Sequence, residues 1–302
     1  MTRTADPDGQ TVAERLQVRL GELTPAERKV ARVLMAEYPV RGLQPVAKLA
    51  AAAGVSAPTV VRLVSKLSFD SYAGFQRSLK SEVTARLASP QATQAERAVG
   101  GTGCGDEPDA LTRSERLLCD GIRSSFARLQ RADFEQAVCL LADQRRRVTL
   151  IGGRFSSMLA DYLAAHLRVL RPNVVSAAGG DRPSVLLDIG RRDVLVAFDY
   201  RRYQHDTVRT AVAAKRQGAT LIAFTDPYLS PLAAHADVIL TSSVRSPSPF
   251  GALTPAFALV EAVVAALAER LGDQALARMA RYDALYQRTV GAPAEGEKRD
   301  CR

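Results

Sequence analysis

The sequence has little of what metal centres, disulfide scaffolds and membrane proteins are built from. Its 302 residues include no tryptophan, three histidines and four cysteines, Cys104, Cys119, Cys139 and Cys301. The cysteines lie far apart without a Cys-x-x-Cys pair, which predicts reduced thiols and no metal or other cofactor. No apolar run approaches the roughly 20 residues that span a bilayer, and the first residues lack the apolar segment of a secretion signal. We therefore expect a cytoplasmic protein without a membrane partner.

Positive charge is what the chain has in excess. Lysine and arginine number 41 against 32 acidic residues, which gives a formal net charge of +9 and a pI near 9.7. This balance favours a polyanionic partner, although it is weak support by itself. The length and the apolar content predict a globular protein of two domains.

Residues 46–67, VAKLAAAAGVSAPTVVRLVSKL, have the pattern of two short helices joined by a tight turn. Ala50 is small enough for a close crossing of the helices, and Gly54 can adopt the positive φ that the turn requires. The Ser56 hydroxyl is placed to cap the second helix, and Pro58 falls in its first turn. The pattern is typical of a helix-turn-helix whose second helix enters the major groove of double-stranded operator DNA.

The outer face of that second helix combines small, hydroxyl-bearing and basic side chains. Arginine suits guanine or phosphate, serine and threonine suit either, and valine suits a thymine methyl group. An amphipathic helix pair inside any α-rich core is the alternative, but the spacing, the cap and the basic face together favour DNA. The predicted DNA-binding residues are Ser56, Ala57, Thr59, Val61, Arg62, Ser65 and Lys66.

Helical patterns on both sides complete a first domain over residues 11–87. Thr24 and Glu27 form a capping box for a helix that ends before Pro39, and apolar spacing after Phe69 predicts a last helix. Residues 88–108 lose this periodicity and gain glycine and proline, which predicts a flexible linker.

Residues 109–290 are predicted to form a second, α/β domain. Two helices should precede strands at 148–151, 173–177, 194–198, 221–225 and 238–240, with helices at 156–170, 206–217, 255–271 and 274–290. Strands that alternate with helices imply a doubly wound parallel sheet, whose ligands bind where strands end and helices begin. The apolar helix 255–271 is a candidate subunit contact.

This order of parts resembles the RpiR-type bacterial transcriptional regulators, in which a helix-turn-helix domain precedes a sugar isomerase (SIS) domain. The resemblance is carried by LTPAERKVARVLMAEYP and VAKLAAAAGVSAPTVVRLVSKLSFDSYAGFQRSL, then by VTLIGG, DVLVAFDY and ATLIAFTDPYLSPLAAHADVIL. It implies control of a sugar-catabolic operon by a homodimer or homotetramer. It also implies a phosphorylated sugar as the effector, bound in the SIS domain.

The two loops that would hold such an effector depart from the family pattern. Gly-x-Gly-x-Ser appears as Gly152-Gly153-Arg154-Phe155-Ser156, and Ser-x-Ser-Gly-x-Thr as Asp199-Tyr200-Arg201-Arg202-Tyr203-Gln204. A carboxylate at 199 would repel phosphate unless an arginine neutralised it. Arg202 replaces a glycine, so a left-handed backbone there would cost ~1 kcal/mol or more. The candidate ligand-binding residues are Gly153, Arg154, Ser156, Ser157, Asp199, Arg201, Arg202 and Gln204.

These loops leave three outcomes open. The arginines could grip an altered anionic ligand, Asp199 and Gln204 could hold a polar sugar or other metabolite, or the domain could bind nothing and only oligomerise. In the last case Asp199 would pair with Arg201 or Arg202 across a subunit contact. We expect the segment from Ser230 to Ala233 to have only a structural role.

Two enzyme classes compete with the regulator interpretation. A sugar-phosphate isomerase needs an acid and a base near the sugar, and His205, Asp206 and Glu261 form no compelling pair. A dinucleotide-dependent oxidoreductase needs a third glycine after Gly152-Gly153, and Met158 occupies a candidate position for it. We therefore expect a regulator that is not an enzyme.

Overall fold

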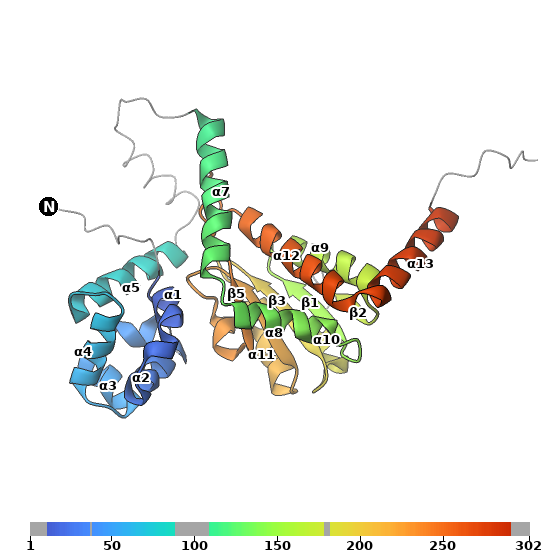
Figure 1. Cartoon of the computed structure of the whole chain (residues 1–302). Coiled ribbons are helices and arrows are strands. Elements are labelled where there is room, and N and C mark those ends of the chain that lie inside the picture. The colour runs from blue at the N-terminus through green and yellow to red at the C-terminus, as the bar shows by residue number, and fades with distance from the viewer. Residues whose placement is uncertain (1–10, 37, 88–108, 178–181, 291–302) are drawn as a thin grey trace, which may run out of the picture.

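The computed structural model describes residues 11–36, 38–87, 109–177 and 182–290, arranged as a helical bundle beside a sheet covered by helices (Figure 1). The predicted linker, residues 88–108, lies outside the described residues. No single helix within the described ranges has the length and apolar composition to cross a membrane. One bent pair of helices, Val46–Ala53 and Ala57–Lys66, passes by length and composition alone.

The N-terminal bundle is built from amphipathic helices. They are α1 (Val12–Val18), α2 (Pro25–Ala36), α3 (Val46–Ala53), α4 (Ala57–Lys66) and α5 (Tyr72–Leu87), with 3-10 turns at Leu20–Glu22 and Val40–Leu43. The predicted capping box is confirmed, because the Thr24 N–H donates to Glu27 Oε2 at 2.8 Å and the Glu27 N–H to Thr24 Oγ1 at 3.3 Å. Leu16, Val30, Leu49 and Leu63 belong to the buried cluster that joins these helices.

The second body contains the predicted parallel sheet. Its strands are β1 (Val148–Gly152), β2 (Val174–Ser176), β3 (Val194–Asp199), β4 (Thr220–Thr225) and β5 (Val238–Thr241), in the order β2-β1-β3-β4-β5. Its helices are α7 (Ala110–Arg128), α8 (Arg131–Ala142), α9 (Ser157–Leu170), α10 (Arg182–Asp188), α11 (His205–Arg216), α12 (Thr254–Leu271) and α13 (Asp273–Thr289).

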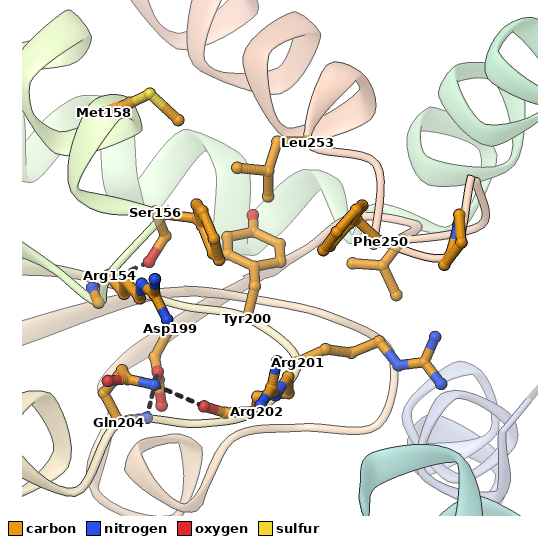
Figure 2. Close-up of a pocket in the computed structure, with 15 residues that line it drawn as sticks. Arg154, Ser156, Met158, Asp199, Tyr200, Arg201, Arg202, Gln204, Phe250 and Leu253 are labelled. Carbon is orange, nitrogen blue, oxygen red and sulfur yellow. Dashed lines mark hydrogen bonds between the residues drawn. The ribbon is translucent and has the colours of Figure 1, made fainter. Parts of the chain in front are cut away.

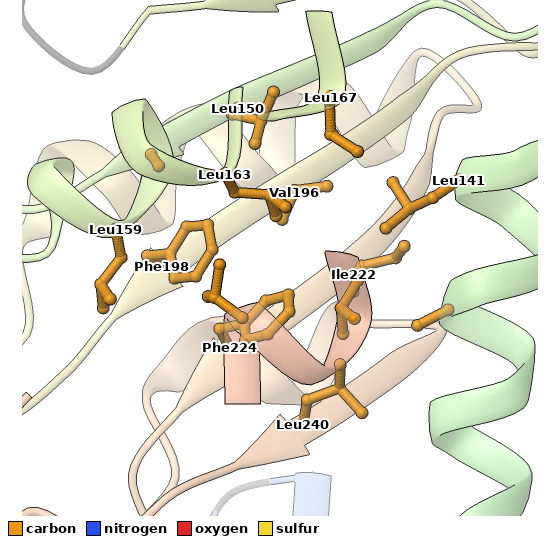
Figure 3. Close-up of a cluster of buried hydrophobic side chains, with 14 of the residues drawn as sticks. Leu141, Leu150, Leu159, Leu163, Leu167, Val196, Phe198, Ile222, Phe224 and Leu240 are labelled. Atoms are coloured by element: carbon orange, nitrogen blue, oxygen red, sulfur yellow. The ribbon is translucent and has the colours of Figure 1, made fainter. Parts of the chain in front are cut away.

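Both faces of the sheet are buried, as the continuous apolar strands require. Helices α8, α9 and α12 cover one face, where the rings of Phe198 and Phe224 stack at 4.5 Å among leucines (Figure 3). Helices α10 and α11 cover the other face around Leu195 and Ala211. The helices leave uncovered the sheet edge formed by the carboxyl ends of β1, β3 and β4, and the loops that follow these strands lie there.

One helix was not predicted, and another has a clear role in the core. Helix α10 was not predicted, because only Val185 of its seven residues is buried and its periodic signal is short. The composition of helix α12 has an explanation within this chain, and its role as a subunit contact stays a prediction. Its apolar residues Leu259, Val263 and Leu267 pack into the core of this chain.

The bundle and the sheet body touch through α1 and the loop that follows β4. The Thr11 hydroxyl donates to the Pro227 carbonyl at 2.9 Å, and Ala13 packs with Leu229 and Ala233. The first helix of the bundle is thus in contact with a loop at the carboxyl edge of the sheet.

Candidate functional site

The turn between α3 and α4 has the geometry expected of a helix-turn-helix. The axes of the two helices differ by 102°, and Gly54 ends α3 with a φ of 62°. The Val55 N–H returns to the Ala50 carbonyl at 3.0 Å, which closes the turn. Ala50 is buried at the crossing together with Leu63. The sequence-based placement of the turn is confirmed.

Helix α4 presents a mixed polar face to solvent. Ser56, Val61, Arg62 and Ser65 are exposed, and Ala57 is half-buried. Val61, Arg62 and Ser65 lie away from the apolar side of α4, which carries Val60 and Leu63, whereas Ala57 packs partly against the bundle core.

Thr59 was predicted to lie on this exposed face, and that placement is wrong. Thr59 is 5% exposed, and its hydroxyl lies 3.0 Å from the Ser56 hydroxyl and accepts a hydrogen bond from Arg62 Nη2 at 3.1 Å. The hydroxyl cap at Ser56 is also wrong, because the Thr59 N–H donates to the Ser56 carbonyl instead. A spacing of three residues puts 56, 59 and 62 on one side of the helix. Thr59 therefore positions Arg62 by accepting a hydrogen bond from its guanidinium group.

Lys66 differs from its neighbours because it is anchored within the bundle. Its ammonium group lies 2.8 Å from Glu27 Oε2 and donates to the Glu22 carbonyl at 3.3 Å. Burial opposes ionisation of Glu27, but hydrogen bonds from Lys66 and Thr24 outweigh it and lower the pKa of this carboxyl. Lys66 therefore holds α4 against α2.

A cavity of about 690 Å³ lies at the carboxyl edge of the sheet (Figure 2). Loops after β1 and β3 and the segment before α12 enclose it, as expected for a doubly wound sheet. The predicted residues that line it are Gly153, Arg154, Ser156, Asp199, Arg201, Arg202 and Gln204. Ser157 does not line it, and its hydroxyl donates to the Arg154 carbonyl at 3.3 Å.

Close contacts fix the first loop. A Cβ at Gly152 would come within 2.6 Å of Ser157 Cα, so only glycine fits there. Ser156 is 4% exposed, and its hydroxyl accepts from the Gly153 N–H at 2.9 Å and donates to the Phe198 carbonyl at 2.8 Å. The hydroxyl proton of Ser156 is therefore used in the hydrogen bond that joins the first loop to β3.

Asp199 is fully buried at the end of β3. The Ser230 hydroxyl donates to Asp199 Oδ2, and the Gln204 N–H donates to Oδ1 at 3.0 Å. Burial raises the pKa of Asp199 to about 6 against the lowering effect of these hydrogen bonds. It forms no ion pair with a described residue of this chain. The carboxyl anchors the second loop, and Ser230 both caps a 3-10 turn at Pro231–His235 and holds Asp199.

The arginines of the two loops have different surroundings. Arg202 adopts a φ of 68°, the left-handed conformation in which a non-glycine residue is strained. The Arg201 guanidinium lies over the Tyr228 ring at 5.6 Å, and that of Arg154 over Phe155 at 5.2 Å. Arg154 and Arg202 are exposed, and neither forms an ion pair within the described ranges.

The cavity also has a wall that sequence reasoning missed. It is formed by apolar and aromatic residues together with Gly251: Phe155, Met158, Tyr200, Val244, Pro249, Phe250 and Leu253. Phe155 and Tyr200 lie inside the two loops already singled out. The segment 244–253 follows β5 and has no local signal of its own, because only the folded sheet brings it to the loops.

Comparisons with known proteins match both parts of the chain. The family model for the helix-turn-helix domain of the rpiR family matches residues 10–89, and the SIS domain model matches residues 140–269. The HTH-type transcriptional regulator HexR of Pseudomonas aeruginosa is 30% identical over 72% of this chain and 73% of the relative. The bifunctional protein glk of Burkholderia mallei is 26% identical, and the match spans 76% of this chain but only 34% of that protein.

Solved structures share the fold. The sugar isomerase domain of an RpiR transcription factor from Sphaerobacter thermophilus has a TM-score of 0.54 at 23% identity, covering 57% of this chain and 97% of that one. The NanR protein of Vibrio vulnificus, solved in complex with ManNAc-6P, has a TM-score of 0.52 at 17% identity, covering 91% and 98%. The second match extends over both the bundle and the sheet.

Proposed function

Because this chain belongs to the RpiR family of helix-turn-helix transcriptional regulators that carry a SIS domain, we propose that α4 binds operator DNA under the control of an anionic metabolite held at the sheet edge. The observation that carries the proposal is the cavity lined by Arg154 and Arg202, two exposed arginines without an ion-pair partner in the described chain. We propose 11–87 and 109–290 as the limits of the two domains.

DNA binding is assigned to the exposed part of α4, with Ser56, Ala57, Val61, Arg62 and Ser65 as contacts and Thr59 as support. Arg62 is the side chain best placed for a base or a phosphate, since it projects from the face opposite the bundle core. Arg62→Ala should weaken binding to a duplex selected from a random pool by ~1–3 kcal/mol. Arg123→Ala, on exposed α7, is the matched control; equal affinities for all three proteins would refute the assignment.

The effector site is tested with sugar phosphates. We expect glucose 6-phosphate or a related sugar phosphate at millimolar concentration to raise the melting temperature of the wild type and to change its affinity for DNA. Arg202→Ala and Arg154→Ala should abolish both effects, because each removes a guanidinium that lines the cavity. Ser157→Ala leaves the cavity lining intact and is the control. A panel of anions without any effect would refute the site.

We propose that the regulator acts as a homodimer, since two recognition helices fit a palindromic operator. Helix α13 offers a surface for this contact, because it projects from the body of the molecule (Figure 1). Its exposed apolar residues are Leu276, Met279, Tyr282, Leu285 and Tyr286.

We propose that the chain has no isomerase activity. The acid and base candidates are placed outside the cavity lining. Asp206 pairs with Arg182 at 3.3 Å, and Glu261 accepts a hydrogen bond from the Tyr162 hydroxyl at 3.0 Å. His205 is exposed at the start of α11. Conversion of pentose or aminohexose phosphates by the purified protein would refute this.

A further inference from the structure

The cavity at the sheet edge has two chemically different sides. Arg154, Arg202 and Gln204 lie on one side, whereas Met158, Leu253 and Phe250 lie on the other, beyond the ring of Tyr200 (Figure 2). A ligand that fills the cavity therefore meets cations at one end and apolar carbon at the other.

Large apolar side chains on this side of the cavity are exposed to solvent. Phe155, Met158 and Phe250 are 55%, 53% and 60% exposed, although they border a cavity. An unsubstituted sugar phosphate carries hydroxyl groups over most of its surface, so it would leave these side chains in contact with polar groups or water. A ligand with an aromatic or acyl group would cover them, and burial of apolar surface is favourable.

The cationic side is suited to one anionic group. Arg154 and Arg202 form no ion pair in the described chain, and the carboxyl of Asp199 is bound by Ser230 and the Gln204 N–H. This carboxyl belongs to the cavity lining, but Asp199 is fully buried and each of its oxygens accepts a hydrogen bond from the protein. A phosphate or carboxylate group could approach both guanidinium groups without facing an unpaired carboxylate oxygen.

The volume is compatible with a ligand of two parts. Ligand cavities commonly measure roughly 300–1,000 Å³ and are mostly apolar with a few placed polar groups. This cavity, of about 690 Å³, lies within that range and has both kinds of lining.

We propose that the effector is an anion joined to an aromatic or acyl group, and that the apolar side of the cavity selects it over unsubstituted sugar phosphates. This inference rests on the proposed function, in which an anion bound at this cavity controls DNA binding. The anionic group binds at Arg154 and Arg202. The apolar group packs between Tyr200 and Phe250, with Met158 and Leu253 beside it.

Four small probes separate the two parts of the ligand. Phenyl phosphate has both parts, phenylacetate replaces the phosphate with a carboxylate, glucose 6-phosphate lacks the apolar part, and phenyl glucoside lacks the charge. By calorimetric titration of the full chain, we expect phenyl phosphate to bind at least about tenfold more tightly than glucose 6-phosphate. Phenylacetate shows whether a carboxylate suffices, and phenyl glucoside should bind weakest.

Phe250→Ser is the decisive variant, with Leu187→Ser as its control. Leu187 is 86% exposed on α10 and does not line the cavity. Phe250→Ser should weaken phenyl phosphate about tenfold and leave glucose 6-phosphate unchanged, since only the former packs on the ring. Arg202→Ala should weaken both, and Leu187→Ser neither.

The outcomes distinguish the two proposals. If glucose 6-phosphate binds at least as tightly as phenyl phosphate, and Phe250→Ser changes neither, the apolar selection is refuted while the effector site stands. If Phe250→Ser converts a dimer to a monomer in sedimentation without altering either affinity, Phe250 is a subunit contact and the inference is refuted. If no anion binds and DNA affinity never changes, the proposed function fails too.

Discussion

At the scale of single residues, Asp199 has an ionisation that the fold opposes. Burial raises the pKa of this carboxyl to about 6 from 3.8, while Ser230 and Gln204 hold it by hydrogen bonds. The folded state binds the proton of Asp199 more tightly than the unfolded chain does. The contribution of Asp199 to the free energy of unfolding is therefore complete below about pH 4, and it is lost as the pH rises through about 6.

Asp199→Asn removes this titration and should gain stability relative to the wild type as the pH rises. We expect the difference in free energy of unfolding to move in favour of the variant by roughly 1–3 kcal/mol between about pH 4.5 and 7.5, measured by urea denaturation. Asp70→Asn, on an exposed turn, controls for the change in net charge. A difference that does not vary with pH would contradict the raised pKa.

Arg62 and Lys66 are both basic residues of α4, but only Lys66 forms an ion pair within the bundle. Lys66 neutralises Glu27, whose side chain is 3% exposed, so Lys66→Met should lower the free energy of unfolding by ~1–3 kcal/mol. Arg62 is exposed, so Arg62→Ala should change it by less than about 0.5 kcal/mol. Thermal denaturation of both variants measures the contrast, and equal losses would contradict it.

At the scale of elements, most of the fold follows from local patterns. The turn at Gly54, the capping box at Thr24 and the buried strands each depend on residues close in sequence, so the sequence predicts them. Helix α10 was missed because its signal is short, and Thr59 was misplaced because its hydroxyl is paired with the side chains of Ser56 and Arg62. Helical spacing alone does not show such side-chain pairing.

Gly54 provides a test of the helix-turn-helix turn. A Cβ there meets nothing within 4 Å, so the only cost of Gly54→Ala is its φ of 62°. We expect a loss of ~1 kcal/mol in the free energy of unfolding. Gly21→Ala is the control, since a Cβ there is equally unobstructed and no positive φ is involved. The same stability change in both variants would show that the left-handed turn carries no cost.

Helix α13 allows a test of the subunit contact. Leu285 is 48% exposed on its apolar face, so a charge there should oppose association without disturbing the core. Leu285→Lys should weaken the dimer by about tenfold or more in sedimentation velocity. Leu111→Lys, on α7 where Leu111 is 79% exposed, is the control. A dimer unaffected by the α13 variant would place the contact elsewhere.

At the scale of the whole molecule, the order and direction of the strands explain why one side of the cavity could be predicted from the sequence and the other could not. Parallel strands end at one edge, so the loops with Arg154 and Arg202 were expected to meet. The wall around Phe250 was not, because it follows β5 and reaches the cavity only through the order of strands. Residues that join a site from a distant segment carry no local pattern.

The loop after β4 connects the cavity to the DNA-binding bundle. Tyr203, in the second loop, donates to Asp226 at 2.8 Å, and Arg201 lies over the Tyr228 ring. The loop after β4 also contacts α1: its residue Leu229, which is 4% exposed, packs against Ala13 of α1. A ligand that moves the second loop would therefore act on the contact between the two bodies.

Leu229→Asp should uncouple the two bodies, because it places a carboxylate in an apolar contact with Ala13 and Ala233. We expect the variant to bind phenyl phosphate and DNA separately with affinities near those of the wild type. The effect of phenyl phosphate on DNA affinity, expected at ~1–3 kcal/mol in the wild type, should be lost. Fluorescence anisotropy of labelled DNA, with and without phenyl phosphate, measures this change in DNA affinity. Leu187→Asp is the control. Coupling that survives in Leu229→Asp would mean that the signal reaches α4 by another route, such as a second subunit.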